Sequence, residues 1–385
     1  QNRYMRAVQL EIPPHGAKKG ERHVIAVRHV SLPSIFRDNM VLLKILAAGM
    51  NRRDHWSALG LYPGLVFENS TLGCDGCGII VDPSTLQPLS EDLYLLVPSR
   101  GWLRDEAGPE AALPNAPADI ATNEFGGHGF GILGATRQVC GTGTFCEYIA
   151  VDRTQLVRAP SHLTAVQSAS LPCAAVTAYR ALFTKGHVQA GHNVLITGIG
   201  GGVAMLALQM AVAAGANVFV TGGSDAKLRN AKTLHACEGL LYKDEAWPDK
   251  LRKSLPTTRP YLDAVIDSAG GDIAGQAIRA GLRDGGRVVV FGMTAVPKVA
   301  FTMREVLKNV DLQGTTLGSA YEFAQSIRFL EHHKIVPVID TVLNGLEETE
   351  KGLTLLADAE KRSGGKVVIR VCDDAPSPVS ILARN

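Results

Sequence analysis

The chain has 385 residues, of which 46% are hydrophobic and 20% are charged. Its formal net charge is only +2, so it lacks the basic field expected of a protein that binds nucleic acid or anionic lipid. At about 150 residues per domain, this length and composition predict a globular protein of two domains with small neutral partners.

The N-terminal segment QNRYMRAVQLEIPP has no apolar core of signal-peptide length, and no stretch reaches the roughly 20 apolar residues of a membrane span. Seven cysteines are too sparse for a disulfide scaffold, which favours reduced thiols. We therefore expect a cytoplasmic protein.

The first part of the chain, to about Arg158, is rich in Gly, Pro and short β-branched runs such as VIAVRHVSL, MVLLKILAAGM and TFCEYIAVD. This pattern predicts a domain of strands and turns. Within it, residues 99–134 are polar and proline-rich, which predicts a long surface excursion that either borders a site or is partly mobile.

From about Thr164 the pattern changes to apolar strands that alternate with helical segments, among them NVLITG, VAMLALQMAVAAG, NVFVTG and GRVVVFGM. This alternation predicts βαβ units and an α/β fold with a doubly wound parallel sheet. After about Ala320 we expect two more helices, a strand pair around VPVIDTVLNG and a final strand, KVVIRV, which could return to the first domain.

A glycine-rich turn follows the predicted strand at 193–197 and opens a helix. It contains Gly198, Gly201, Gly202 and Val203. Glycines in this position allow a tight turn and close approach of a pyrophosphate, whose charge the free N–H groups of the helix start can bind. Because a second strand follows at the right distance, the turn predicts a dinucleotide site.

The second strand of this unit ends in Gly222-Gly223-Ser224 instead of the acid that binds the ribose hydroxyls of NAD. Ser224 and Lys227 would offer a hydroxyl and a cation to a 2′-phosphate. We therefore expect NADPH to be preferred over NADH.

Many ordered segments are similar to the medium-chain dehydrogenase/reductase superfamily, in particular to its zinc-independent quinone oxidoreductase and enoyl reductase branch. They include AAGMNRRDHWSALGLYPG, TLGCDGCGII, SLPCAAVTAYRALF, GHNVLITGIGGGVA and GGKVVIRV. The resemblance implies a GroES-like β-rich catalytic domain (1–168), a Rossmann NADP-binding domain (169–325), a C-terminal return to the catalytic domain (326–385) and a homodimer.

The same resemblance implies further cofactor-binding residues. It points to Thr177 and to the loop residues Tyr242, Gly292, Thr294, Thr316, Leu317 and Gly318. The loop residues follow predicted strands, where ligands of open α/β sheets bind.

The zinc ligands of the alcohol dehydrogenases in this superfamily are largely replaced. In those enzymes the first ligand segment looks like Gly-x-Cys-His, and Asn51 stands here in place of its cysteine. Their Gly-His-Glu segment corresponds to Gly73-Cys74-Asp75 in this chain. A set of Cys74, Asp75 and Cys173 is chemically possible, but we expect no metal. The C-x-x-C spacing of Cys74 and Cys77 is interpreted as a pair of buried small thiols, not a redox motif.

Without zinc, the accessible chemistry is hydride transfer from NADPH to an enone or a quinone. Charge then develops on the carbonyl oxygen, which requires hydrogen-bond donors and a proton source. Asn51 and Tyr62 are the candidate donors, and Trp56 would add an aromatic wall. The alternatives are a zinc-type alcohol dehydrogenase and an NADPH-binding sensor or structural protein with little turnover.

Overall fold

The computed structural model describes residues 3–12, 15–16 and 18–372, and the chain falls into two compact units. Unit 1 consists of Gln1–Cys173, Ser319–Arg362 and Lys366–Asn385, and unit 2 of Ala174–Gly318 and Ser363–Gly365. The boundaries expected from the sequence fall after residues 168 and 325. No helix among the described residues has the length and apolar character needed to cross a membrane.

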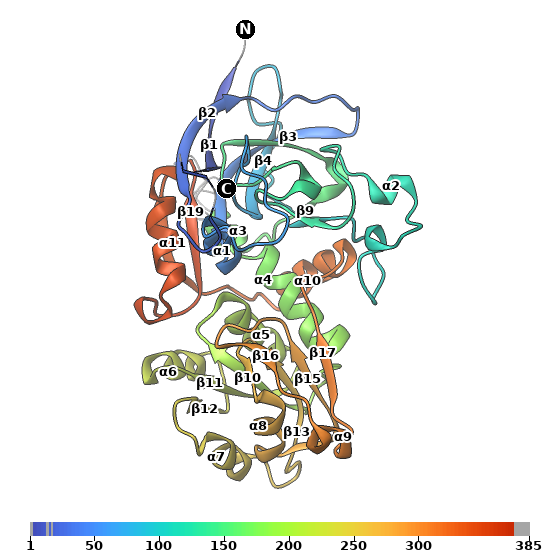
Figure 1. Cartoon of the computed structure of the whole chain (residues 1–385), viewed down its shortest axis with the longest axis vertical. Helices are drawn as coiled ribbons and strands as arrows, with labels where there is room; N and C mark the ends of the chain where they lie inside the picture. Colours follow the sequence, from blue (N-terminus) through green and yellow to red (C-terminus); the bar gives the residue numbers. More distant parts are fainter. Residues whose placement is uncertain (1–2, 13–14, 17, 373–385) are drawn as a thin grey trace, which may run out of the picture. The chain divides into compact units, whose positions relative to one another are not determined.

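Unit 1 is built on a mostly antiparallel seven-stranded sheet with the order β18-β19-β3-β4-β5-β9, in which β8 also pairs with β3. Strands β3, β4, β9 and β19 of this sheet are labelled in Figure 1. Nearly every side chain of the long central strand β3 is buried, because the run MVLLKILAAGM is apolar on both faces. The strands are β1 (Tyr4–Glu11), β2 (Val24–Ser31), β3 (Met40–Met50), β4 (Asp75–Val81), β5 (Tyr94–Leu96), β6 (Ser99–Arg100), β7 (Gly131–Ile132), β8 (Tyr148–Asp152), β9 (Leu156–Arg158), β18 (Ile339–Asn344) and β19 (Lys366–Arg370).

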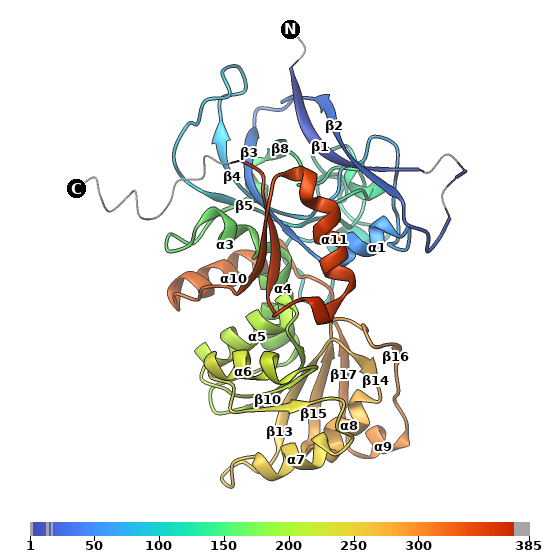
Figure 2. The ribbon, with the colours of Figure 1, turned by 90° about the vertical axis from the view of Figure 1, so that its left-hand side faces the viewer.

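The C-terminal part of unit 1 returns to its central strand. Strand β19 pairs antiparallel with β3, with Val367 opposite Met50, and this register brings Lys366 to the end of β3. A strand pair was expected around VPVIDTVLNG, but the structure has the single strand β18, which pairs in parallel with β19. Figure 2 shows α11 running beside α1. The helices of unit 1 are α1 (Arg52–Ala58), α2 (Ala118–Ala121), α3 (Ala165–Ala169), α10 (Ala320–His332) and α11 (Thr349–Ala357), with short 3-10 turns at 110–112, 137–139, 153–155, 346–348 and 359–361.

The polar segment 99–134 is anchored at its start. Arg100 and Glu124 form a buried ion pair 2.9 Å long, and Trp102 packs edge-on against Phe130. The backbone N–H of Ala320, the first residue of α10, donates to the carbonyl of Trp102. Strands β6 and β7 pair within the segment, so it is an anchored excursion of unit 1.

Unit 2 is an α/β fold with a parallel six-stranded sheet of order β12-β11-β10-β13-β15-β17. Its strands are β10 (Asn193–Ile199), β11 (Asn217–Gly222), β12 (Glu238–Leu241), β13 (Leu262–Asp267), β15 (Leu282–Val290) and β17 (Asp311–Gly314), and a separate pair is formed by β14 (Gly270–Gly271) and β16 (Val296–Val299). This is the doubly wound sheet predicted from the alternating segments.

Helices pack against the strands of this sheet. They are α5 (Gly202–Ala213), α6 (Asp225–Thr233), α7 (Trp247–Ser254) and α8 (Ile273–Arg279), and α9 (Met303–Leu307) packs against α8. Helix α4 (Pro172–Tyr179) crosses the boundary between the two units and continues as a π-helical turn, Arg180–Lys185. The core of unit 2 buries Leu195, Phe219, Trp247, Val265 and Val288 among other apolar side chains.

Candidate functional site

Asn51 lies at the junction between strand β3 and helix α1 in unit 1. It adopts an extended conformation as the N-cap of α1, and its backbone N–H donates to Asp54 Oδ2 over 2.7 Å. The Asn51 side chain instead turns to the cluster described next. Its Nδ2 donates to Asp75 Oδ2 at 2.8 Å and lies 3.5 Å from Cys74 Sγ.

Asp75 is fully buried and is the centre of this cluster. Its Oδ1 accepts from the backbone N–H of Cys173 at 2.9 Å and from Cys74 Sγ at 3.5 Å. Its Oδ2 accepts from Asn51 Nδ2 and, at 3.0 Å, from Lys366 Nζ. Both oxygens of the buried carboxylate are therefore satisfied by protein donors.

Lys366 is the cation of this cluster, and it is not among the site residues expected from the sequence. It begins strand β19, is 6% exposed, and also donates to Asn51 Oδ1 at 2.6 Å. Burial alone would lower the pKa of Lys366, but the charge and the hydrogen bond of Asp75 raise it above its ordinary value. The signal in the sequence was a single lysine at the start of an otherwise apolar strand, because a buried cation requires a buried partner.

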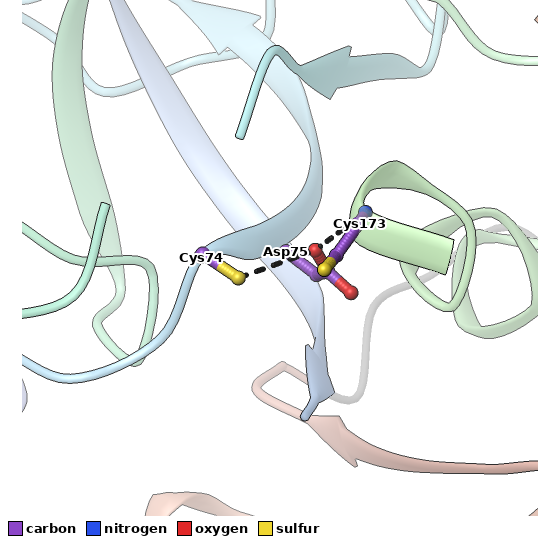
Figure 3. Close-up of side chains that lie close together, drawn as sticks. All are labelled: Cys74, Asp75 and Cys173. Carbon is purple, nitrogen blue, oxygen red and sulfur yellow. Dashed lines mark hydrogen bonds between the residues drawn. The ribbon is translucent and has the colours of Figure 1, made fainter. Parts of the chain in front are cut away.

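Two thiols lie beside Asp75, and Figure 3 shows them with the carboxylate between strand β4 and the start of α4. The ligand atoms of Cys74, Asp75 and Cys173 all lie within 4.8 Å of one another. The hydrogen bond with Cys173, burial and the charge of Asp75 raise the pKa of Cys74 well above its usual range. Cys74 therefore holds its proton at neutral pH.

The other two predicted catalytic residues also lie in unit 1. The Arg53 guanidinium lies 4.2 Å from the centroid of the Tyr62 ring and donates to the carbonyls of Leu133 and Gly134. Burial raises the pKa of Tyr62, against the opposing effect of Arg53, so its hydroxyl stays protonated at neutral pH. The Trp56 side chain is 36% exposed.

Asp54 is a second buried carboxylate close to Asn51. Burial raises its pKa to about 6, while Arg53 and the backbone N–H of Asn51 act in the opposite direction. Its Oδ1 has no hydrogen-bond partner among the described residues and lies 3.8 Å from Arg53 Nη1. Half of this carboxylate is therefore unsatisfied.

In unit 2, the glycine turn lies at the carboxyl end of β10. Gly198 and Gly200 have positive φ values of 65° and 128°, which side-chain-bearing residues rarely adopt. Gly201 is the N-cap of α5 with no side-chain cap, and a Cβ atom there would meet no atom within 4 Å. The open space and the free helix start fit the pyrophosphate of a nicotinamide cofactor.

The residues expected to choose between NADPH and NADH lie next to this turn. Ser224 caps α6 and accepts from the backbone N–H of Lys227 at 3.4 Å. The Lys227 stem covers Gly200, where an added Cβ would come within 2.9 Å of Lys227 Cδ. The Tyr242 hydroxyl lies similarly close to Gly223. Strands β10, β11 and β12 therefore bring these groups to one edge of the sheet.

The remaining predicted cofactor residues follow other strands or lie in a helix. Thr294 donates from its backbone N–H and its hydroxyl to the carbonyl of Ser268, and Gly292 lies beside the same residue. Leu317 is buried with a φ of 48°, in the segment Thr316–Gly318 that follows β17. Thr177 is buried within α4.

The possible zinc ligands of unit 1 are already engaged by hydrogen bonds between protein groups. A catalytic zinc site needs three protein ligands and an open position. Cys74, Asp75 and Cys173 could supply these three ligands, but Asp75 already accepts four hydrogen bonds. The Lys366 ammonium, 3.0 Å from Asp75 Oδ2, would also repel a metal cation. A zinc ion could use Asp75 only by breaking this buried ion pair.

Comparisons with known proteins agree with this organisation. The family described as zinc-binding dehydrogenase matches residues 202–332. The zinc-type alcohol dehydrogenase-like protein YogA of Leptosphaeria maculans is 38% identical over 94% of this chain and 99% of its own length. Acryloyl-coenzyme A reductase of Metallosphaera sedula is 28% identical over 59% of this chain and 65% of its own length. This chain is also similar to a crystal structure of an NAD-dependent alcohol dehydrogenase. The two are 28% identical and superpose with a TM-score of 0.77, over 96% of this chain and 100% of the other.

The chain therefore belongs to the zinc-type alcohol dehydrogenase-like proteins of the medium-chain dehydrogenase/reductase superfamily. It is an oxidoreductase of this family with a β-rich unit and a Rossmann-like unit. The relatives and structural neighbours indicate a nicotinamide cofactor and small-molecule substrates.

Proposed function

We propose that the chain uses NADPH to reduce a carbon–carbon double bond conjugated to a carbonyl group, or a quinone, without a catalytic metal. The carrying observation is the closed set of hydrogen bonds among Asn51, Asp75 and Lys366, because it engages Asp75, the third ligand that zinc would need beside the thiols of Cys74 and Cys173. The likeness to an acryloyl-coenzyme A reductase supports this proposal, because its name denotes an unsaturated acyl thioester.

Two donors of unit 1 would stabilise the reacting carbonyl. NADPH would supply the hydride when it is bound, negative charge would then develop on the carbonyl oxygen, and a proton from water would complete the reduction. The Tyr62 hydroxyl keeps its proton and can donate it in a hydrogen bond to this oxygen. The Asn51 N–H that faces Cys74 Sγ makes only a 3.5 Å contact, so a substrate oxygen could displace the thiol. Trp56 would provide an apolar surface.

Asp75 and Lys366 act as positioning residues in this proposal. Lys366 holds Asn51 Oδ1, and Asp75 holds one hydrogen of Asn51 Nδ2, so the plane of the amide and the direction of its second N–H are fixed. A donor fixed before the reaction stabilises developing charge without reorganisation. Neither positioning residue needs to contact the substrate.

The preference for NADPH is proposed from the end of strand β11. Ser224 offers a hydroxyl and Lys227 a cation, and the first acid after the strand, Asp225, is exposed on the first turn of α6. A 2′-phosphate would therefore gain charge-assisted hydrogen bonds in place of carboxylate repulsion. We propose that the other parts of the cofactor contact Thr177, Tyr242, Gly292, Thr294, Thr316, Leu317 and Gly318.

The proposal is tested by following nicotinamide absorbance with a panel of quinones, enones, enals and aldehydes, using NADPH and NADH in parallel. We expect turnover of enones or quinones with NADPH, unchanged after dialysis against a metal chelator. Turnover of aldehydes alone that the chelator abolishes would establish a zinc-type alcohol dehydrogenase. Tight NADPH binding without turnover of any substrate would instead identify a binding protein.

We also propose that the chain forms a homodimer through unit 2. The surface around α9 exposes four large apolar side chains, Phe301, Met303, Val306 and Leu307, with exposed fractions from 43% to 73%. Strand β17 ends the sheet order of this unit and so carries an unpaired edge among the described strands. Exposed apolar clusters and free strand edges are common features of subunit interfaces.

A further inference from the structure

Unit 2 has a polar pocket at the amino ends of its strands, opposite the carboxyl ends where the glycine turn lies. It has a volume of about 210 Å³ and is lined by His187, His192, Asp263, Arg283 and Arg287 together with two glycines. His192 precedes strand β10, Asp263 is the second residue of β13, and Arg283 is the second residue of β15. We call this the distal pocket. Because the cofactor turn follows the carboxyl end of β10, the distal pocket is a separate site of the same unit.

The acid of the distal pocket is already neutralised. Asp263 is 4% exposed, and its two oxygens accept from the Arg259 guanidinium at 2.6 and 2.8 Å. Its Oδ2 also accepts from the backbone N–H of Asn193. Although burial alone would raise the pKa of Asp263, these hydrogen bonds hold it below its ordinary value, so the carboxylate stays ionised and paired. It therefore orients the neighbouring cations without leaving free negative charge.

Arg283 supplies an incompletely used cation. Its Nη1 lies 3.8 Å from Asp263 Oδ1, beyond hydrogen-bond distance, and its Nε reaches the carbonyl of Asp284 only at 3.4 Å. The side chain is 51% exposed, so its guanidinium fork is available to a ligand. Arg287, by contrast, is engaged by the Lys185 carbonyl and by Asp311, each at 3.2 Å, and adds positive charge to the wall.

The two imidazoles complete the lining. Burial, with Arg259 and Arg283, lowers the pKa of His192 against the opposing effect of Asp263, so its ring is neutral at pH 7 and carries one N–H donor. Its Nδ1 is buried with no hydrogen-bond partner among the described residues. His187 is exposed and has a φ of 48°, a conformation that is uncommon for a residue with a side chain and that recurs at functional sites.

We propose that the distal pocket binds a tetrahedral oxyanion, a phosphate ion or the phosphate group of a small metabolite, with Arg283 as its main ligand and the imidazoles of His187 and His192 as further donors. Arg259, Arg283 and Arg287 carry three positive charges against the two negative charges of Asp263 and Asp311, so the charge balance favours an anion over a metal cation. A guanidinium fork binds two oxygens of a phosphate group at once.

The test is a titration of the full-length protein with inorganic phosphate, followed by NMR through the imidazole C–H signals. The signals are assigned with the variants His187→Asn and His192→Asn. We expect both signals to shift saturably with phosphate but not with chloride at equal ionic strength. Arg283→Gln should weaken the affinity at least roughly tenfold, and Arg283→Lys, which keeps the charge but loses the fork, should weaken it less. A phosphomonoester titrated in parallel identifies which form of phosphate the pocket prefers.

The glycine turn is a second place where phosphate could bind, so Lys227→Gln is the matched control. If the distal pocket is the site, phosphate binding survives Lys227→Gln and is lost in Arg283→Gln. The reverse pattern would assign the binding to the cofactor turn and overturn the proposal. Shifts that do not saturate, or that chloride reproduces, would reduce the effect to screening of charge. Saturation of the two histidine signals by Zn²⁺ without any response to phosphate would also overturn it.

Discussion

Lys366 Nζ lies 3.0 Å from Asp75 Oδ2, and both side chains are almost completely buried although they are 291 positions apart in the chain. The pair joins the C-terminal strand β19 to the start of strand β4 through the shared neighbour β3. Both residues also hydrogen-bond to the side-chain amide of Asn51, beside the thiols of Cys74 and Cys173. The pair is therefore both a structural bond of unit 1 and the reason for proposing chemistry without zinc.

Replacement of Lys366 should strongly destabilise unit 1. In Lys366→Met the carboxylate of Asp75 loses its buried cation, which typically costs about 3–5 kcal/mol of unfolding free energy. Urea denaturation followed by circular dichroism measures this loss. The matched control is Lys308→Met, whose partner Asp284 lies on the surface, and we expect it to cost less than about 1 kcal/mol. Equal losses in the two variants would show that the buried pair has no special role.

The double variant Lys366→Met, Asp75→Asn tests whether the loss of stability comes from the unpaired charge of Asp75. It removes both charges, so it should recover part of the stability lost in Lys366→Met. If the double variant lost as much unfolding free energy as the two single variants added together, the two residues would not be coupled.

Asp54 should make stability fall as the pH rises from about 4 to about 6. Its folded pKa is raised to about 6 from 3.8, so between these values the folded state holds a proton that the unfolded state has released. The stabilisation is complete below the lower value and is lost as the pH passes the upper one, a change of about 3 kcal/mol at 1.36 kcal/mol per unit. Unfolding by urea at several pH values should show this fall in the native chain.

The variant Asp54→Asn should remove that pH dependence. The amide oxygen can still accept from the Asn51 N–H, so the start of α1 is retained. Asp249→Asn, at an exposed position paired with Arg279, should leave the dependence unchanged. An unaltered pH profile in Asp54→Asn would assign the titration to another group.

Much of the fold follows from local patterns in the sequence. The apolar runs and glycine turns of unit 2 specify both the parallel sheet and the turn after β10, because each βαβ unit is local in the chain. Around Leu171, helix α3 ends before Pro172, where α4 begins, and α4 continues into a π-helical turn. Proline has no N–H and disfavours helical geometry in the preceding residue, whereas the π turn has no clear signature in the sequence.

The candidate site was only partly predictable, for the opposite reason. The sequence brought together Asn51, Cys74, Asp75 and Cys173 as counterparts of a ligand set, and the structure places them in one cluster. Lys366 joins them through the pairing of β19 with β3, which is a contact between the two ends of the chain. Such long-range register depends on the whole sheet and not on any local pattern.

Ser224→Asp should shift the cofactor preference from NADPH towards NADH. An aspartate can still cap α6, so the fold is kept, but its carboxylate would repel a 2′-phosphate and could bind a ribose hydroxyl. We expect the dissociation constant of NADPH to rise at least roughly tenfold, measured by quenching of protein fluorescence. Lys227→Gln should weaken NADPH while leaving NADH nearly unchanged. If these variants weakened the affinity for NADPH and for NADH equally, the 2′-phosphate would not be bound by Ser224 and Lys227.

Leu307→Asp should convert the proposed homodimer into a monomer. The leucine side chain is 73% exposed within the apolar cluster around α9, where a buried carboxylate in an interface would be costly. Sedimentation equilibrium measures the mass of each variant. Leu89→Asp, at an exposed site in unit 1, should sediment with the same dimeric mass as the native chain. A monomeric native chain at micromolar concentration would contradict the proposed dimer.

Asn51→Cys should strengthen zinc binding at the cluster of Cys74, Asp75 and Cys173. The substitution replaces the amide that binds Asp75 and Lys366 with a third thiol beside Cys74 and Cys173, and three thiolates match the ligand number of a catalytic zinc site. Competition with a chromogenic chelator should show zinc binding at least roughly a hundredfold tighter in the variant than in the native chain, because the native cluster would have to break its ion pair first. Asn39→Cys, on the surface, controls for the added thiol. Stoichiometric zinc retained by the native chain against the same chelator would instead show that Cys74, Asp75 and Cys173 suffice, and would favour a zinc-type alcohol dehydrogenase.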